Sequence, residues 1–128
     1  MLRLFLMVSA LVWLPYGLLC LVSPAYLAEI AGVSATSTTG TVELRAMYGG
    51  LQAALGVLAG VALVQPSMQR PALTALAFVC GGLFTARLLG ALVGGEVSSY
   101  TAVGLLFELL SSAFATRLLL RLPAVAEA

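Results

Sequence analysis

Six of the polar side chains within the long apolar stretches of this sequence are candidates for a functional site, and their types define the chemistry open to the chain. They are Tyr16, Arg45, Tyr48, Gln52, Arg87 and Glu108. Arginine binds carboxylates and phosphates, glutamate can take up or release a proton, and tyrosine and glutamine form hydrogen bonds. These residue types indicate recognition of a polar or anionic group in otherwise apolar surroundings.

The sequence contains no histidine and no aspartate, which excludes most familiar catalytic sites. A Ser-His-Asp triad cannot form, and the commonest metal ligands are missing. No nucleophile stands beside a base and no cofactor-binding loop is present, so we expect no catalytic set, no metal and no cofactor. Cys20 and Cys80 lie in separate apolar segments outside any CxxC motif, and we expect two buried single thiols.

The composition is that of a membrane protein. Of the 128 residues, 62% are hydrophobic and 9% are charged, whereas about a quarter of the residues of a soluble domain are charged. The net charge is only +1. Because no basic tract is present, nucleic acid is excluded as a partner.

Four apolar runs are long enough to cross a bilayer core, which needs roughly 20 helical residues. They cover approximately residues 4–22, 42–64, 72–93 and 101–122. The sequence therefore predicts an all-α fold, an integral membrane bundle of four transmembrane helices forming one domain over residues 1–128. The first run is longer than a signal-peptide core and no clean cleavage site follows it, so we expect a retained helix.

The arginines at or near the ends of these runs predict the orientation of the chain. Arg3, Arg70, Arg117 and Arg121 all fall on one side of a four-span protein, whereas Glu29 and Glu96 fall on the other. Loops rich in arginine stay cytoplasmic, so both termini should be cytoplasmic. The first loop contains PAYLAEIAGV, which fits either a short interfacial helix or an ordered loop.

These directions place four polar groups at a similar depth in the outer half of the membrane. A rise of about 1.5 Å per residue puts Tyr16, Tyr48, Arg87 and Glu108 about 9 to 10 Å below the outer ends of their helices. Gln52 shares the inward face of the second span with Tyr48, and Arg45 is shallow enough to extend to the headgroups. The sequence therefore predicts one polar layer to which all four helices contribute side chains.

Arg87 and Glu108 should form an ion pair within this layer. They carry opposite charges on consecutive antiparallel helices, and an unpaired charge inside a membrane costs several kcal/mol, about 2.5 to 3.5 on insertion scales. Two interpretations stay open at this point. The layer either fixes helix register alone or forms a ligand or ion site.

The segment ELRAMYGG predicts the beginning of the second span. Glu43 is placed in the first turn, where a carboxylate favours the positive end of the helix dipole, and is interpreted as the helix start. Several glycines are spaced for close helix packing, within one chain rather than across a dimer. They are Gly49, Gly50, Gly56, Gly60 and Gly90.

Two longer motifs give the chain a resemblance to a known family. ELRAMYGGLQAALG at 43–56, ARLLGALVGG at 86–95 and the glutamate of LLFELL, Glu108, resemble the small four-span bacterial membrane proteins grouped as domain of unknown function 4345. A more distant similarity is to the DoxX-like small membrane proteins. The resemblance implies a bacterial inner-membrane protein without an assigned activity. The positions that recur in the family correspond to Glu43, Arg45, Tyr48, Gly49, Gly50, Arg87 and Glu108.

The sequence favours a non-enzymatic binding or accessory protein. Its partners would be the lipid bilayer, a lipid, quinone or other amphipathic small molecule, or a membrane protein, including a second copy of the chain. One rival is a proton-coupled small-molecule transporter in which Arg87 releases and recaptures Glu108. The other is a lipid- or quinone-modifying enzyme with Glu108 as acid or base and Tyr48 as hydrogen-bond donor.

Overall fold

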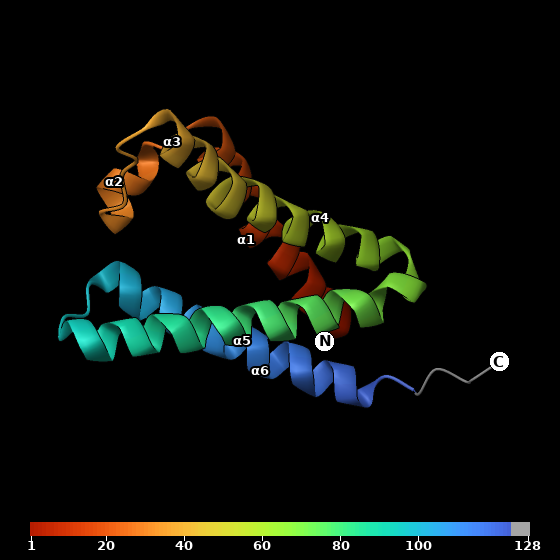
Figure 1. Ribbon diagram of the computed structural model, residues 1–128. Coiled ribbons are helices and arrows are strands. Elements are labelled where there is room, and N and C mark those ends of the chain that lie inside the picture. Colours follow the sequence, from red (N-terminus) through yellow and green to blue (C-terminus); the bar gives the residue numbers. More distant parts are fainter. Residues whose placement is uncertain (124–128) are drawn as a thin grey trace. The chain divides into compact units, whose positions relative to one another are not determined.

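The computed structural model describes residues 1–123, and in that part of the chain all regular structure is helical (Figure 1). Four helical segments have the length and composition to cross a membrane: Leu2–Val22, Thr38–Val64, Pro66–Gly94 and Ser99–Arg121. The predicted all-α fold with four spans is thereby confirmed. The second and third spans begin earlier than the sequence predicted.

The chain divides into two compact units, Met1–Met68 and Gln69–Ala128, and each is described by itself. The first contains α1 (Leu2–Val22), α2 (Tyr26–Ala31), α3 (Thr38–Leu44), the π-helical segment η1 (Arg45–Gly50), α4 (Leu51–Val64) and the short 3₁₀ turn η2 (Pro66–Met68). The second contains α5 (Gln69–Gly94) and α6 (Ser99–Arg121). The single domain over residues 1–128 stays a prediction.

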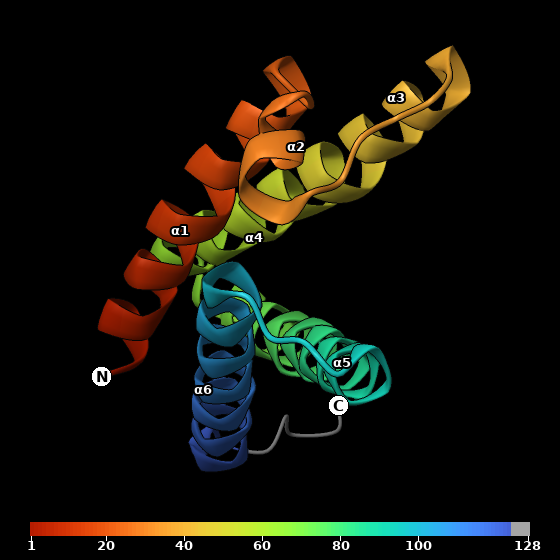
Figure 2. The same cartoon turned by 90° about the vertical axis from the view of Figure 1, so that its left-hand side faces the viewer.

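In the first unit, α1 packs antiparallel against η1 and α4, and the two views show these helices side by side (Figures 1 and 2). The backbone of Leu21 lies beside Gly49, and that of Leu14 lies beside Gly56. Buried residues of α1 recur every three or four positions, which gives the helix one inward face. They are Leu6, Ser9, Trp13, Gly17 and Cys20.

The connection between α1 and α3 contains the short helix α2. Of the two expectations for PAYLAEIAGV, a helix or an ordered loop, the helix is confirmed. Leu27 is completely buried and anchors this short helix. The helix ends at Gly32, whose φ of 66° lies in the left-handed region that glycine adopts without steric cost. The predicted interfacial position of α2 stays a prediction.

In the second unit, α5 and α6 form an antiparallel hairpin. At one end, Nη2 of Arg70 donates hydrogen bonds to the carbonyls of Leu122 (3.2 Å) and Pro123 (2.7 Å), which accept them at the C-terminal end of α6. At the other end, Oγ of Ser98 accepts from the amide of Thr101 (3.1 Å) and caps the start of α6. Arg70, which was used above only to predict orientation, therefore also binds the end of α6, a role that the sequence did not predict.

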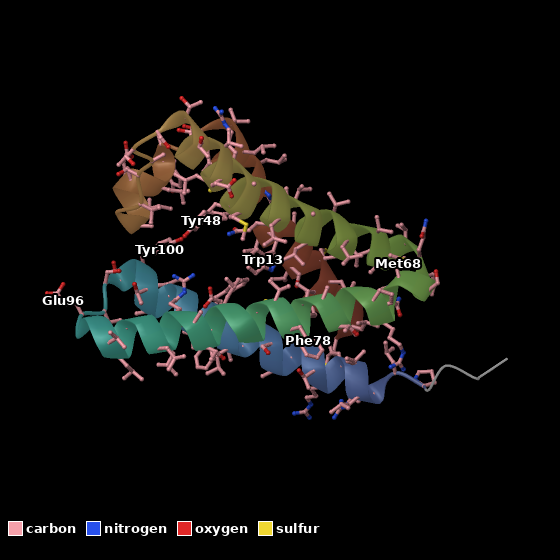
Figure 3. All side chains as sticks on the ribbon, viewed as in Figure 1. Trp13, Tyr48, Met68, Phe78, Glu96 and Tyr100 are labelled. Atoms are coloured by element: carbon pink, nitrogen blue, oxygen red, sulfur yellow. The ribbon has the colours of Figure 1, made fainter. Side chains whose placement is uncertain are left out.

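The outer surface of both units is apolar, as expected of a protein in contact with lipid tails. Large side chains such as Phe78, Leu92 and Leu120 are exposed (Figure 3 labels Phe78). Cys20 and Cys80 are buried free thiols, as predicted. Lipid tails are as apolar as leucine, so cohesion within each unit must come from close packing and hydrogen bonds.

Candidate functional site

The second unit contains the predicted ion pair. Nε of Arg87 donates to both carboxylate oxygens of Glu108, at 3.1 Å to Oε1 and 3.0 Å to Oε2, and Nη2 donates to Oε1 at 2.7 Å. This planar arrangement of charge-assisted hydrogen bonds is the strong form of an arginine–carboxylate contact. The predicted pairing of Arg87 with Glu108 is confirmed.

The two side chains of the pair differ in exposure. The Glu108 side chain is only 4% exposed, whereas the Arg87 side chain is 27% exposed. Within the described residues, Arg87 supplies every hydrogen bond that Glu108 accepts. The carboxylate is therefore the buried member of the pair, and the Arg87 side chain is the partly exposed member.

Two residues of α6 shape the position of the guanidinium. The ring of Tyr100 lies 5.7 Å from Cζ of Arg87, within the range of a cation–π contact (Figure 3 labels Tyr100). A Cβ at Gly104 would lie 2.9 Å from Nε and 3.0 Å from Cζ of Arg87, so a side chain at this position would displace the guanidinium from its present place. Gly104 lies one helical turn before Glu108 and on the same face.

Next to the ion pair, α5 and α6 are in close contact. Oγ of Ser112 donates to the carbonyl of Ala77 at 2.9 Å, and a Cβ at Gly81 would lie 3.1 Å from that Oγ. Ser111 is buried on the same helix as Glu108. Small and polar residues thus hold α5 against α6 directly below the ion pair.

The first unit contains the other four predicted polar residues. Tyr16 is half-buried on α1 and makes a side-chain hydrogen bond with Cys20. Tyr48 of η1, labelled in Figure 3, and Gln52 of α4 are also half-buried. Oε1 of Gln52 is buried without a hydrogen-bond partner among the described residues. The common layer of all six residues stays a prediction, because the two units are described separately.

Arg45 makes a contact that sequence reasoning missed. Its Nε donates to the carbonyl of Leu21 at 3.2 Å, and this carbonyl belongs to the last turn of α1, where helical partners are lacking. The arginine side chain is otherwise exposed. Arg45 therefore ties the start of the second span to the end of the first.

The prediction that Glu43 marks the helix start was wrong. The helix begins at Thr38, and Oγ of Ser37 accepts from the amide of Gly40 at 3.0 Å. Glu43 is exposed near the C-terminal end of α3, beyond the first turn. The serine and threonine residues before it were interpreted as a loop, although Ser37 followed by Thr38 is a standard helix-start signal.

RAMYGG forms a π-helix, η1, which the sequence analysis did not predict. Such segments are rare, occur mostly as single turns inside α-helices, and are frequent at functional sites. Paired glycines at 49 and 50 were the available signal, because they weaken the preference for a regular α-helix. The wider turn changes the rotation of Arg45 relative to α4.

The structure separates the glycines predicted for close packing into two groups. A Cβ at Gly49 would lie 2.7 Å from the Cα of Leu21, and one at Gly56 would meet the backbone of Leu14 at a similarly prohibitive distance. A Cβ at Gly50 would have an ordinary contact of 3.8 Å, and those at Gly60 and Gly90 would meet nothing within 4 Å. Gly17, which the prediction omitted, packs against the backbone of Ala53.

Comparison with known proteins places the chain in a family. No curated protein and no solved structure matches it at significant similarity. The family model described as Domain of unknown function (DUF4345) matches residues 1–119. This match includes the first helix, which lies outside the motifs at 43–56 and 86–95. The chain belongs to the DUF4345 family of domains of unknown function.

Proposed function

We propose that this chain is a multi-pass protein of the bacterial cytoplasmic membrane that binds an anionic amphipathic molecule, a lipid or a quinone-like compound, through Arg87. Both termini lie in the cytoplasm, and the protein acts as a binding or accessory protein rather than as an enzyme. The observation that carries the proposal is the unequal exposure of the ion pair, 27% for the Arg87 side chain and 4% for Glu108.

The geometry of the pair supports this role. Glu108 fixes the guanidinium in one orientation, and Tyr100 and Gly104 restrict it further. A guanidinium that is already oriented loses little conformational freedom when a carboxylate or phosphate approaches its exposed part. Apolar helix faces around it accommodate the rest of an amphipathic molecule.

A proton-coupled transporter is the second candidate. Intramembrane arginine and glutamate are residues on which proton relays depend, and Glu108 is a buried carboxylate held by a single partner among the described residues. Binding of an anion to a neutral pair leaves one negative charge, and uptake of a proton by Glu108 would neutralise it. Proton-dependent flux into liposomes that contain only this protein would favour transport over simple binding.

Native mass spectrometry of the purified chain tests the binding proposal. The wild-type protein should retain an anionic amphipathic molecule at Arg87, and the double variant Arg87→Leu with Glu108→Leu should retain one such molecule fewer while staying folded. Arg121→Gln, which removes an exposed arginine of the same helix hairpin, is the matched control and should keep the molecule. Equal retention by the double variant and the wild type would reject the role of Arg87. The same spectra report whether the chain is a monomer, a homo-oligomer or part of a complex.

A further inference from the structure

The first unit contains a groove that the proposed function does not use. It is lined by Arg3, Leu4, Met7 and Leu63 and has a volume of about 430 Å³. Arg3 and Met7 lie one turn apart on α1, and Leu63 comes from the last turn of α4, which packs antiparallel to α1. The groove is therefore lined by one cationic and three apolar side chains, at one end of the pair formed by α1 and α4.

The charge of Arg3 is not compensated nearby. Within residues 1–123 it has neither an ion pair nor a hydrogen bond, and the first turn of α1 contains no acidic residue. The two acidic residues of the first unit, Glu29 and Glu43, follow or face the opposite end of α1. A helix of 21 residues is about 30 Å long, so their charges are screened from Arg3.

We propose that this groove binds an anionic phospholipid, with the headgroup phosphate on Arg3 and an acyl chain along Leu4, Met7 and Leu63. The guanidinium fork matches phosphate oxygens geometrically, which a simple positive charge does not. A free phosphate would use the arginine alone, whereas a lipid uses all four lining residues. Basic pockets at the cytoplasmic ends of membrane helices are suited to lipid headgroups of this kind.

Lipid titration of the full-length chain, followed by native mass spectrometry, tests the groove. Phosphatidylglycerol and phosphatidylcholine with identical acyl chains are compared, because they differ in headgroup charge alone. One basic residue near the membrane surface corresponds to about a fivefold preference, so the groove should contribute about that factor to the wild-type protein's preference for phosphatidylglycerol. Arg3→Gln should lower the preference by this factor and leave any contribution of Arg87 unchanged, and Arg3→Lys should keep part of the groove's contribution.

Two further variants separate a built groove from general attraction. Arg121→Gln removes an exposed arginine of the second unit and should leave the preference unchanged. Met7→Trp fills the groove while keeping Arg3, and it should weaken the binding of both lipids. Equal losses in Arg3→Gln and Arg121→Gln would overturn the proposal, as would unchanged lipid binding in Met7→Trp.

A competition arm distinguishes the lipid from a free anion. Excess inorganic phosphate should not displace phosphatidylglycerol, because it cannot occupy the apolar walls. Displacement by phosphate alone would show an anion site rather than a lipid site and would overturn the proposal. If Arg3→Gln failed to fold, the comparison of Arg3→Lys with Met7→Trp would still decide between charge and groove. None of these variants changes Arg87 or Glu108. The proposed lipid groove can therefore be rejected while the proposed function of Arg87 is kept, and the proposed function can be rejected while the groove is kept.

Discussion

At the scale of single residues, Arg87 and Glu108 form an ion pair in which the two partners are unequally dependent on each other. Glu108 is buried and receives all its hydrogen bonds within the described chain from Arg87, whereas Arg87 is partly exposed. Loss of the arginine leaves a buried carboxylate without a donor. Loss of the glutamate leaves a long, flexible side chain that can turn towards a more polar region.

We expect this asymmetry in a double-mutant cycle. Arg87→Leu should lower the free energy of unfolding in detergent by about 3 to 5 kcal/mol, the range for a buried charge that loses its partner. Glu108→Leu should cost less. The double variant Arg87→Leu with Glu108→Leu should recover part of the loss, because two apolar groups strand no charge. Chemical denaturation followed by circular dichroism measures all four proteins.

One result of the double-mutant cycle would contradict a stabilising role of the ion pair. If the double substitution costs the sum of the single ones, the two residues do not interact energetically and the pair has no stabilising role. Recovery of stability together with loss of the bound molecule would show that the pair serves binding rather than helix register alone.

The residue-scale site was predictable where it depended on charge and depth. Opposite charges at matching depth on consecutive helices were sufficient to pair Arg87 with Glu108. The contact of Arg45 with the Leu21 carbonyl depends on how far η1 turns the helix, and the orphaned oxygen of Gln52 depends on how α1 and α4 are rotated. Neither rotation can be calculated from the spacing of residues on an ideal helix.

At the scale of elements, α1 and α4 are held together by backbone contacts at glycines. Gly17 and Gly56 each lie against the backbone of the facing helix, where no Cβ can be accommodated. Gly60 is on the same helix as Gly56, but a Cβ there meets nothing within 4 Å. The two positions of α4 thus share a residue type and a surrounding sequence, and they differ in packing.

We expect Gly56→Ala to destabilise the protein and Gly60→Ala to change its stability little. The added methyl group at 56 must push α1 away, and such overpacking costs typically about 1 to 3 kcal/mol. At position 60 the change should stay within about 0.5 kcal/mol, as for substitutions away from packed contacts. Thermal unfolding in detergent compares the two variants. Equal effects at both positions would contradict the close contact at Gly56.

Element boundaries were the part of the fold that the sequence described least well. Four runs of apolar residues identified the spans, because the bilayer demands a minimum length. The start of α3 was misplaced because TSTTGT is polar and resembles a loop, although Ser37 provides the cap. The π-helix at Arg45–Gly50 has no distinct hydrophobic period, and it forms where Gly49 must approach α1.

At the scale of the whole molecule, orientation in the membrane follows from which residues share an end of each unit. Arg70 contacts the carbonyls at the end of α6, so the arginines 70 and 121 belong to the same end of the hairpin. Arg3 lines a groove with Leu63 at the end of α4, and only η2 separates α4 from α5. If the four spans cross a bilayer, we expect all these ends to emerge on one side of it, and the arginines favour the cytoplasmic side.

Cysteine labelling tests this orientation in a background in which Cys20 and Cys80 are replaced by alanine. Val97, exposed between α5 and α6, and Ser67, exposed in η2, are chosen because neither side chain caps a helix, whereas Ser98 caps α6. With an impermeant thiol reagent on intact spheroplasts, Val97→Cys should react and Ser67→Cys should react only after the membrane is permeabilised. The reverse pattern would invert the topology and place the Arg87–Glu108 pair in the inner half of the membrane. Reaction of both positions in intact spheroplasts would mean that α5 does not separate them across the bilayer, and it would contradict the third span itself.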